Sequence, residues 1–166
     1  NQKENDVVDE YAPIDRDTTD VVTKDMLWEI EKEFYRLVNE ERKHVGVAPL
    51  TYNKHLDDIA QARSVEITQL YSHTRPDGTS FDTIIDLEQY KYSIAGENIC
   101  YFYHLEGTFS IDEITFTGSD EQIKNAANIV FNAFKNSPGH YANMIHKDFE
   151  NAGIGVSYVW DSELDI

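Results

Sequence analysis

Two histidines and one glutamate are the residues of this sequence that could do chemistry together: His73, Glu97 and His140. Neutral imidazole and carboxylate groups are good ligands for zinc and other borderline divalent cations, and they also serve as general acids and bases. The three residues lie far apart in the sequence and match no short zinc signature. Their spacing alone therefore does not establish that they converge.

His73 is predicted to follow directly after a helix. Asn53 can cap that helix, whose apolar side chains recur at helical spacing until about Tyr71. Arg63 lies on the same apolar stripe, so we expect it to reach solvent or to pair with a carboxylate. The order of Pro, Asp and Gly in residues 75–78 indicates a type I turn.

Glu97 lies in an aromatic and partly β-branched stretch, residues 92–103, which predicts a strand. Gly96 indicates a bulge beside Glu97, and an apolar, hairpin-like segment follows over residues 109–116. Three roles stay open for Glu97. It could act as a general base, bind His140, or accept hydrogen bonds from backbone N–H groups beside Gly96.

His140 is predicted to lie in the first turn of a short helix, which Ser137 can cap with Pro138 at its first position. The positive end of the helix dipole disfavours imidazolium there, and a neutral ring can ligate a metal or accept a proton. Two structural alternatives stay open, in which His140 fixes a facing strand and His73 fixes a loop. Ser137 is interpreted as a cap rather than as a nucleophile.

The rest of the chain predicts further helices and one more strand. Apolar periodicity indicates a helix over residues 27–46, and a capping box at residues 119–122 opens another long helix. Alternation over residues 154–160 is typical of a half-buried strand. Helices and strands without βαβ repetition favour an α+β fold. We expect an acidic, weakly ordered arm over residues 1–25 and one domain over residues 26–166, which lacks a closing C-terminal strand or is truncated there.

Composition limits the partners of this chain of 166 residues. Its formal net charge of −17 disfavours nucleic acid and anionic membranes, and no apolar stretch is long enough to span a membrane. The single cysteine, Cys100, excludes an intrachain disulfide and is interpreted as a small buried hydrophobe. The histidines outside the candidate site are expected on solvated surfaces: His44, His55, His104 and His146.

Four segments resemble, in order, motifs of the CAP superfamily: residues 72–78, 95–99, 136–145 and 153–156. This superfamily comprises cysteine-rich secretory proteins, antigen five and plant pathogenesis-related proteins, and the chain is similar to its cysteine-poor bacterial, SCP-like extracellular form. Residues 37–42, followed by Pro49-Leu50, resemble the opening helix and turn of the family.

The resemblance implies an α-β-α sandwich with a large open cleft, lined in many members by two histidines and two acidic residues. His73 and His140 map to the histidines and Glu97 to one acidic residue, and some relatives bind a divalent metal such as zinc through these groups. The second acidic residue is expected just before His140, where this chain has no carboxylate. That difference should weaken metal binding. Further residues expected to line or support the cleft are Asp77, Asn98, Ser137, Tyr141 and Asn143.

The leading functional prediction is a domain that is secreted or associated with the cell surface and whose cleft binds a lipid, peptide or protein. It holds a divalent cation such as zinc weakly or not at all, and it is not primarily an enzyme. The alternative is a metal-assisted hydrolase in which His73 and His140 hold zinc and Glu97 deprotonates a water. A third hypothesis treats the cleft as vestigial and the acidic arm as the functional element. The first residues do not form a signal peptide, which would have to precede them.

Overall fold

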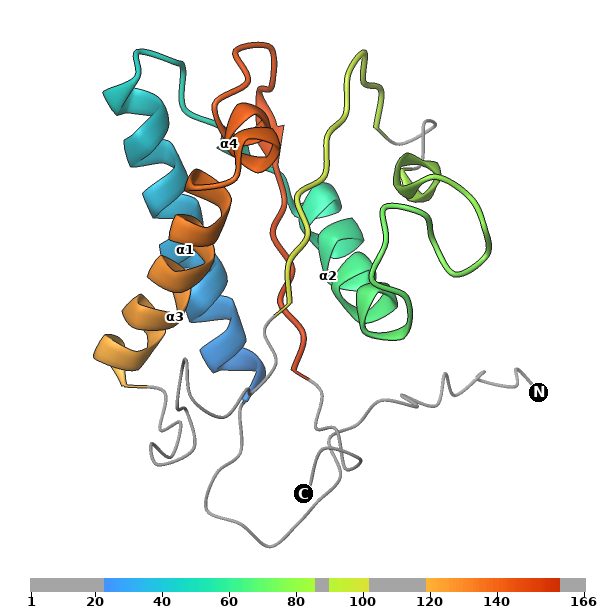
Figure 1. Ribbon diagram of the computed structural model, residues 1–166, viewed down its shortest axis with the longest axis horizontal. Helices are drawn as coiled ribbons and strands as arrows, with labels where there is room; N and C mark the ends of the chain where they lie inside the picture. The colour runs from blue at the N-terminus through green and yellow to red at the C-terminus, as the bar shows by residue number, and fades with distance from the viewer. Residues whose placement is uncertain (1–22, 86–89, 102–118, 159–166) are drawn as a thin grey trace, which may run out of the picture.

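The computed structural model describes residues 23–85, 90–101 and 119–158 (Figure 1). Within these residues the chain forms four α-helices, one short 3-10 helix and two short strands. In chain order they are α1 (Lys24–His44), β1 (Thr51–Tyr52), α2 (Lys54–Gln69), η1 (Phe81–Ile84), α3 (Asp120–Lys135), α4 (Pro138–Met144) and β2 (Asn151–Ala152).

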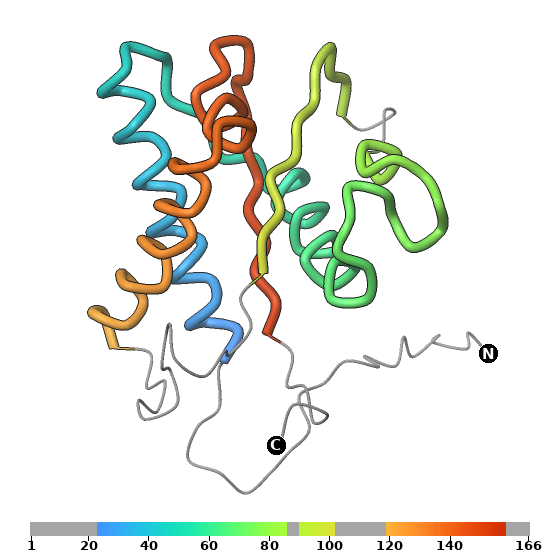
Figure 2. Tube along the Cα trace, viewed as in Figure 1, coloured from blue at the N-terminus to red at the C-terminus, as the bar shows by residue number. Residues whose placement is uncertain are grey.

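The elements form three layers. Helices α1 and α3 lie side by side in one layer, α2 forms the opposite layer, and extended segments, residues 90–101 and 153–158, run between them (Figures 1 and 2). Strands β1 and β2 pair in parallel, Thr51 with Asn151 and Tyr52 with Ala152. This arrangement confirms the predicted α+β class. None of the described helices combines the length and the apolar character needed to cross a membrane.

The apolar core lies mainly between α1 and α3. Phe34 of α1 meets Phe134 of α3 edge to face, with ring centroids 5.9 Å apart, which is a favourable geometry for aromatic pairs. Two groups of buried side chains lie around this contact, and all of them except Met144 of α4 belong to α1 or α3. They are Val38, Phe131, Phe134 and Met144 in one group, and Ile30, Ile123 and Ala127 in the other.

Arg42 is a buried cation that joins α1 to the segment after α4. Its side chain is fully buried, and burial lowers its pKa. The guanidinium donates to four backbone carbonyl oxygens over 2.8 to 3.0 Å, those of Ala48, Met144, His146 and Phe149. Because Arg42 ties the end of α4 to α1, it fixes the helix that carries His140.

The segment after β2 packs tightly on α2 through two glycines. A Cβ atom at Gly153 would lie 2.1 Å from the backbone of Leu56, and one at Gly155 would lie 2.3 Å from that of Ala60. Two carboxylates bind backbone amides of the same segment: Glu31 accepts from the N–H of Val156 at 2.8 Å, and Asp57 accepts from that of Ile154 at 3.4 Å. The segment is therefore held by helices on both sides.

The prediction of two long strands is wrong for the described residues. Residues 92–101 and 153–158 run extended but contain no strand, and the second strand instead occupies Asn151–Ala152. Residues 153–158 make their contacts with helices, and Gly96 serves close packing, because a Cβ atom there would lie 2.7 Å from the Phe149 ring. The hairpin expected over residues 109–116, and Trp160, lie outside the described residues.

The predicted side-chain caps of α2 and α3 are confirmed, whereas α1 begins three residues earlier than predicted, at Lys24. Asn53 accepts a hydrogen bond from the N–H of Leu56, and Ser119 accepts one from the N–H of Gln122. Pro138 occupies the first turn of α4, but Ser137 makes no side-chain capping bond, so that part of the prediction is wrong. The arm of residues 1–25 stays a prediction, although α1 already begins at Lys24.

Candidate functional site

Glu97 lies between Arg63 and His73. Its Oε2 accepts from Arg63 Nε at 2.7 Å, and its Oε1 accepts from Arg63 Nη2 at 3.1 Å. The His73 Nδ1 lies 2.9 Å from the same Oε1. The side chains of Arg63 and Glu97 are 5% and 12% exposed, whereas that of His73 is 56% exposed. A buried ion pair therefore holds one nitrogen of a largely exposed imidazole.

A second ion pair supports Arg63 from the side away from Glu97. Arg63 Nη1 donates to Glu66 at 2.6 Å, and Glu66 also binds Arg75 Nη2 at 2.6 Å. The hydrogen bonds from Arg75 and then Arg63 lower the pKa of Glu66. Arg63 Nη2 also donates to the carbonyl oxygen of Ser72 at 2.9 Å, which places the residue just before His73. Of the two alternatives expected for Arg63, pairing with a carboxylate is the one observed.

His140 is joined to the segment that carries Glu97 through its backbone. Asn98 donates from its amide to the carbonyl oxygen of His140 at 2.9 Å. The Asn143 amide donates to Asn98 Oδ1 at 3.0 Å and to the Glu97 carbonyl at 3.3 Å. These bonds connect Asn98 and Asn143 to the backbone of His140 and Glu97, and a place in the cleft for either residue stays a prediction. The His140 ring packs on Phe134, with centroids 4.8 Å apart, and the described contacts of Glu97 are with His73 rather than His140.

Two of the predicted supporting residues have clear local partners. Asp77 accepts from the N–H and the hydroxyl of Thr79 at 2.9 and 2.6 Å, so it shapes the turn in which Gly78 N–H donates to the carbonyl of Arg75. Hydrogen bonds from Thr79 lower the pKa of Asp77. The Tyr141 hydroxyl donates to Glu41 on α1 at 2.8 Å. A direct ligand contact for either residue stays a prediction.

An exposed aromatic pair lies beside His73 and was not predicted from sequence. The rings of Tyr71 and Tyr101 meet edge to face with centroids 4.4 Å apart, and the two residues are 48% and 43% exposed. Tyr71 donates to the carbonyl oxygen of Ile99 at 3.1 Å. Since residues 71 and 73 both contact the segment 97–101, the pair and the imidazole lie on neighbouring parts of one surface. The sequence could not reveal this pair, because it depends on a contact between two segments that lie far apart in the chain.

The donor arrangement does not match a three-ligand zinc site. Among residues 23–85, 90–101 and 119–158, no group of three or more His, Cys, Asp or Glu side chains could hold a metal ion. Both oxygens of Glu97 already accept hydrogen bonds from Arg63, whose cation would oppose a second positive charge. The described residues therefore do not fit a three-ligand zinc site, and weak zinc binding stays a prediction.

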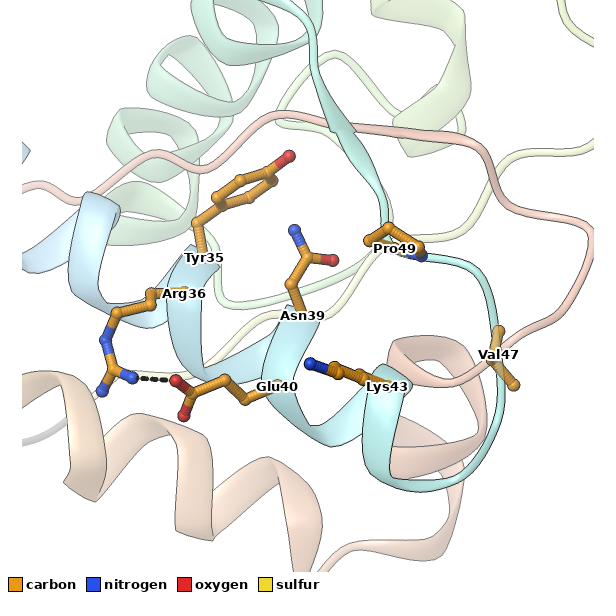
Figure 3. Close-up of a pocket in the computed structure, with 7 residues that line it drawn as sticks. All are labelled: Tyr35, Arg36, Asn39, Glu40, Lys43, Val47 and Pro49. Atoms are coloured by element: carbon orange, nitrogen blue, oxygen red, sulfur yellow. Dashed lines mark hydrogen bonds and ion pairs between the residues drawn. The ribbon is translucent and has the colours of Figure 1, made fainter.

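A shallow hollow of about 550 Å³ lies elsewhere, between α1 and the following loop (Figure 3). It is lined by Tyr35, Arg36, Asn39, Glu40, Lys43, Val47 and Pro49. Tyr35 and Asn39 donate to the carbonyl oxygen of Leu50, so these side chains fix the loop. None of the predicted site residues lines this hollow.

The remaining histidines differ in their exposure. His44 is exposed, as predicted, and His104 lies outside the described residues. His55 and His146 are only partly exposed. His55 packs 6.2 Å from the ring of Tyr90, and its Nε2 is buried without a hydrogen-bond partner. His146 packs on Phe149 with centroids 4.6 Å apart.

Comparison with known proteins identifies the family. The sequence profile of the Cysteine-rich secretory protein family, CAP, matches residues 35–164, so the chain belongs to the CAP family. Among solved structures, it is similar to an extracellular protein containing a SCP domain from Bacillus anthracis strain Ames, with a TM-score of 0.60 and 20% identity. The match covers 82% of this chain and 41% of that one, and it supports the fold alone. A search of curated proteins gave no match.

Proposed function

We propose that this CAP domain is secreted or associated with the cell surface and binds a peptide, protein or lipid ligand at the surface around His73. The observation that carries the proposal is the fixed but exposed imidazole of His73, with Nδ1 bound by Glu97 and 56% of the side chain exposed. A buried ion pair such as that of Arg63 and Glu97 contributes little net stability. Its contact with His73 instead orients the imidazole, and orienting a group before its ligand arrives reduces the entropic cost of binding.

The aromatic pair beside His73 supports recognition at the same surface. Tyr71 and Tyr101 offer large apolar areas with few rotatable bonds, as recognition surfaces commonly do. We propose that His140 also contributes to this surface, since Asn98 binds its backbone carbonyl and Asn143 in turn binds Asn98. The proposed surface therefore combines an apolar part with an oriented polar group.

Hydrolysis is the second candidate, and the pairing of His73 with Glu97 is the observation that favours it. A carboxylate bound to one imidazole nitrogen orients the ring so that the other can act as a general base. In this arrangement Glu97 is a positioning residue, because both of its oxygens already accept hydrogen bonds. His73, rather than Glu97 as first predicted, would then remove the proton. A fluorogenic peptide library tests this, because turnover should disappear in both His73→Ala and Glu97→Gln.

Selection of displayed peptides on the wild-type domain, with counter-selection on His73→Ala, tests the binding proposal. Selected peptides are then titrated calorimetrically into the wild type, His73→Ala and the control His44→Ala, which removes another exposed histidine. The proposal predicts at least a tenfold loss of affinity in His73→Ala alone. Vesicles of zwitterionic phospholipid, sedimented with the same three proteins, test the lipid arm. If neither peptides nor vesicles bind in a His73-dependent way, the proposal is wrong.

A further inference from the structure

The geometry around Glu97 determines which nitrogen of His73 faces a ligand. Arginine donates hydrogen bonds and accepts none, so both Glu97 oxygens act as acceptors toward Arg63. The Oε1 atom that accepts from Arg63 Nη2 is also the atom 2.9 Å from His73 Nδ1. An ionised Glu97 has no proton to donate, so the hydrogen bond to Oε1 is donated by His73 Nδ1–H.

Fixing the proton on Nδ1 leaves Nε2 of the neutral ring with a lone pair. Because Glu97 already binds Nδ1 and 56% of the His73 side chain is exposed, Nε2 is the ring nitrogen left for a ligand. A neutral acceptor at that position takes an amide N–H or a hydroxyl group, and it does not attract a carboxylate or a phosphate.

We propose that Arg63 is a positioning residue, which acts through Glu97 to hold His73 as the Nδ1–H tautomer and so selects a hydrogen-bond donor as the ligand group opposite Nε2. This inference rests on the proposed binding role of His73. Arg63 is suited to the task because its planar fork grips both carboxylate oxygens, which prevents Glu97 from turning away from the imidazole.

Arg75 provides a matched control within the same network. It binds Glu66, as Arg63 does, but its described contacts do not include Glu97. Replacing Arg75 removes a partly buried arginine and disturbs Glu66, but it leaves the grip on Glu97 in place. A general loosening of the region would affect both arginine variants, whereas loss of positioning would follow Arg63 alone.

Long-range ¹H–¹⁵N correlation spectra of the histidine rings, recorded without ligand at about pH 8, where an ordinary histidine is neutral, report the tautomer directly. The wild type and Arg75→Met should show His73 mainly as Nδ1–H. Arg63→Met should show a mixture of tautomers, and Arg63→Lys, which keeps the charge but loses the fork, should lie between them. Glu97→Gln preserves the size of the side chain and should also give a mixture, in case Arg63→Met fails to fold.

The proposal is overturned if wild-type His73 is mainly Nε2–H, or if the folded Arg63 and Glu97 variants keep the wild-type ratio. An equal change in Arg75→Met would also overturn it. Inorganic phosphate added to the wild type at about pH 8 should leave the His73 nitrogen shifts unchanged, because the neutral Nε2 has no proton to donate. A specific shift would contradict the assignment. Since these spectra need no ligand, they separate failure of this inference from failure of the proposed binding function.

Discussion

Replacing Arg42 by methionine should destabilise the domain strongly, because the side chain holds four backbone carbonyls in a fully buried position. A hydrogen bond to a charged group contributes about 1.5–3 kcal/mol. Water can reach some of these carbonyls once the guanidinium is removed, so we expect a loss of about 4 kcal/mol rather than the sum of four such bonds. This is a large part of the ~5–15 kcal/mol that stabilises a typical domain.

Urea unfolding followed by circular dichroism measures the effect of Arg42→Met. Arg42→Lys keeps the charge but not the fork, and we expect a loss of roughly 2 kcal/mol. Lys43→Met changes the exposed neighbour on the same helix and should stay within about 0.5 kcal/mol of the wild type. If the free energy of unfolding of Arg42→Met lay within about 1 kcal/mol of the wild-type value, the buried carbonyls would not depend on Arg42, and the expected role of this side chain would be refuted.

Three further predictions concern other parts of the fold. Burial raises the pKa of Glu31 from its ordinary 4.5 to about 7, so folding favours its protonated form. The contribution of Glu31 to the free energy of unfolding should therefore fall by roughly 3 kcal/mol as the pH rises from 4.5 to above about 7. Glu31→Gln should remove that fall in urea titrations at several pH values. Burial also raises the pKa of Cys100 to about 11, so iodoacetamide at about pH 8 should label the folded protein about 100-fold more slowly than the unfolded one. Gly153→Ala should lose about 2 kcal/mol in thermal unfolding, because its Cβ would meet the α2 backbone. Gly139→Ala, in the open first turn of α4, should be neutral or stabilising by up to ~1 kcal/mol.

Apolar periodicity located the long helices α1, α2 and α3, and local side-chain chemistry marked the starts of α2 and α3. Asn53 and Ser119 bind backbone amides three residues ahead, which the sequence itself displays. The strands could not be located, because the alternation after Gly153 reflects close packing on α2 as well as extended backbone. A period of two predicts the extended conformation, but it does not reveal whether a neighbouring strand or a helix contacts the segment.

The candidate site was predicted in its residues but not in its connections. Family resemblance selected His73, Glu97 and His140, and Arg63 was expected to find a carboxylate. That this carboxylate is Glu97 depends on a contact between residues 34 positions apart. Arg42 was missed for a similar reason: it lies in a run of charged residues that is typical of a helix surface, and its burial results from tertiary packing.

Mapping amide chemical-shift changes when a selected peptide or lipid is added shows directly whether the surface around His73 binds the ligand. The largest changes should surround Tyr71, His73 and Tyr101, and they should disappear in His73→Ala. Changes centred instead on Tyr35, Asn39 and Lys43, which line the hollow beside α1, would contradict this expectation and place ligand binding elsewhere on the domain.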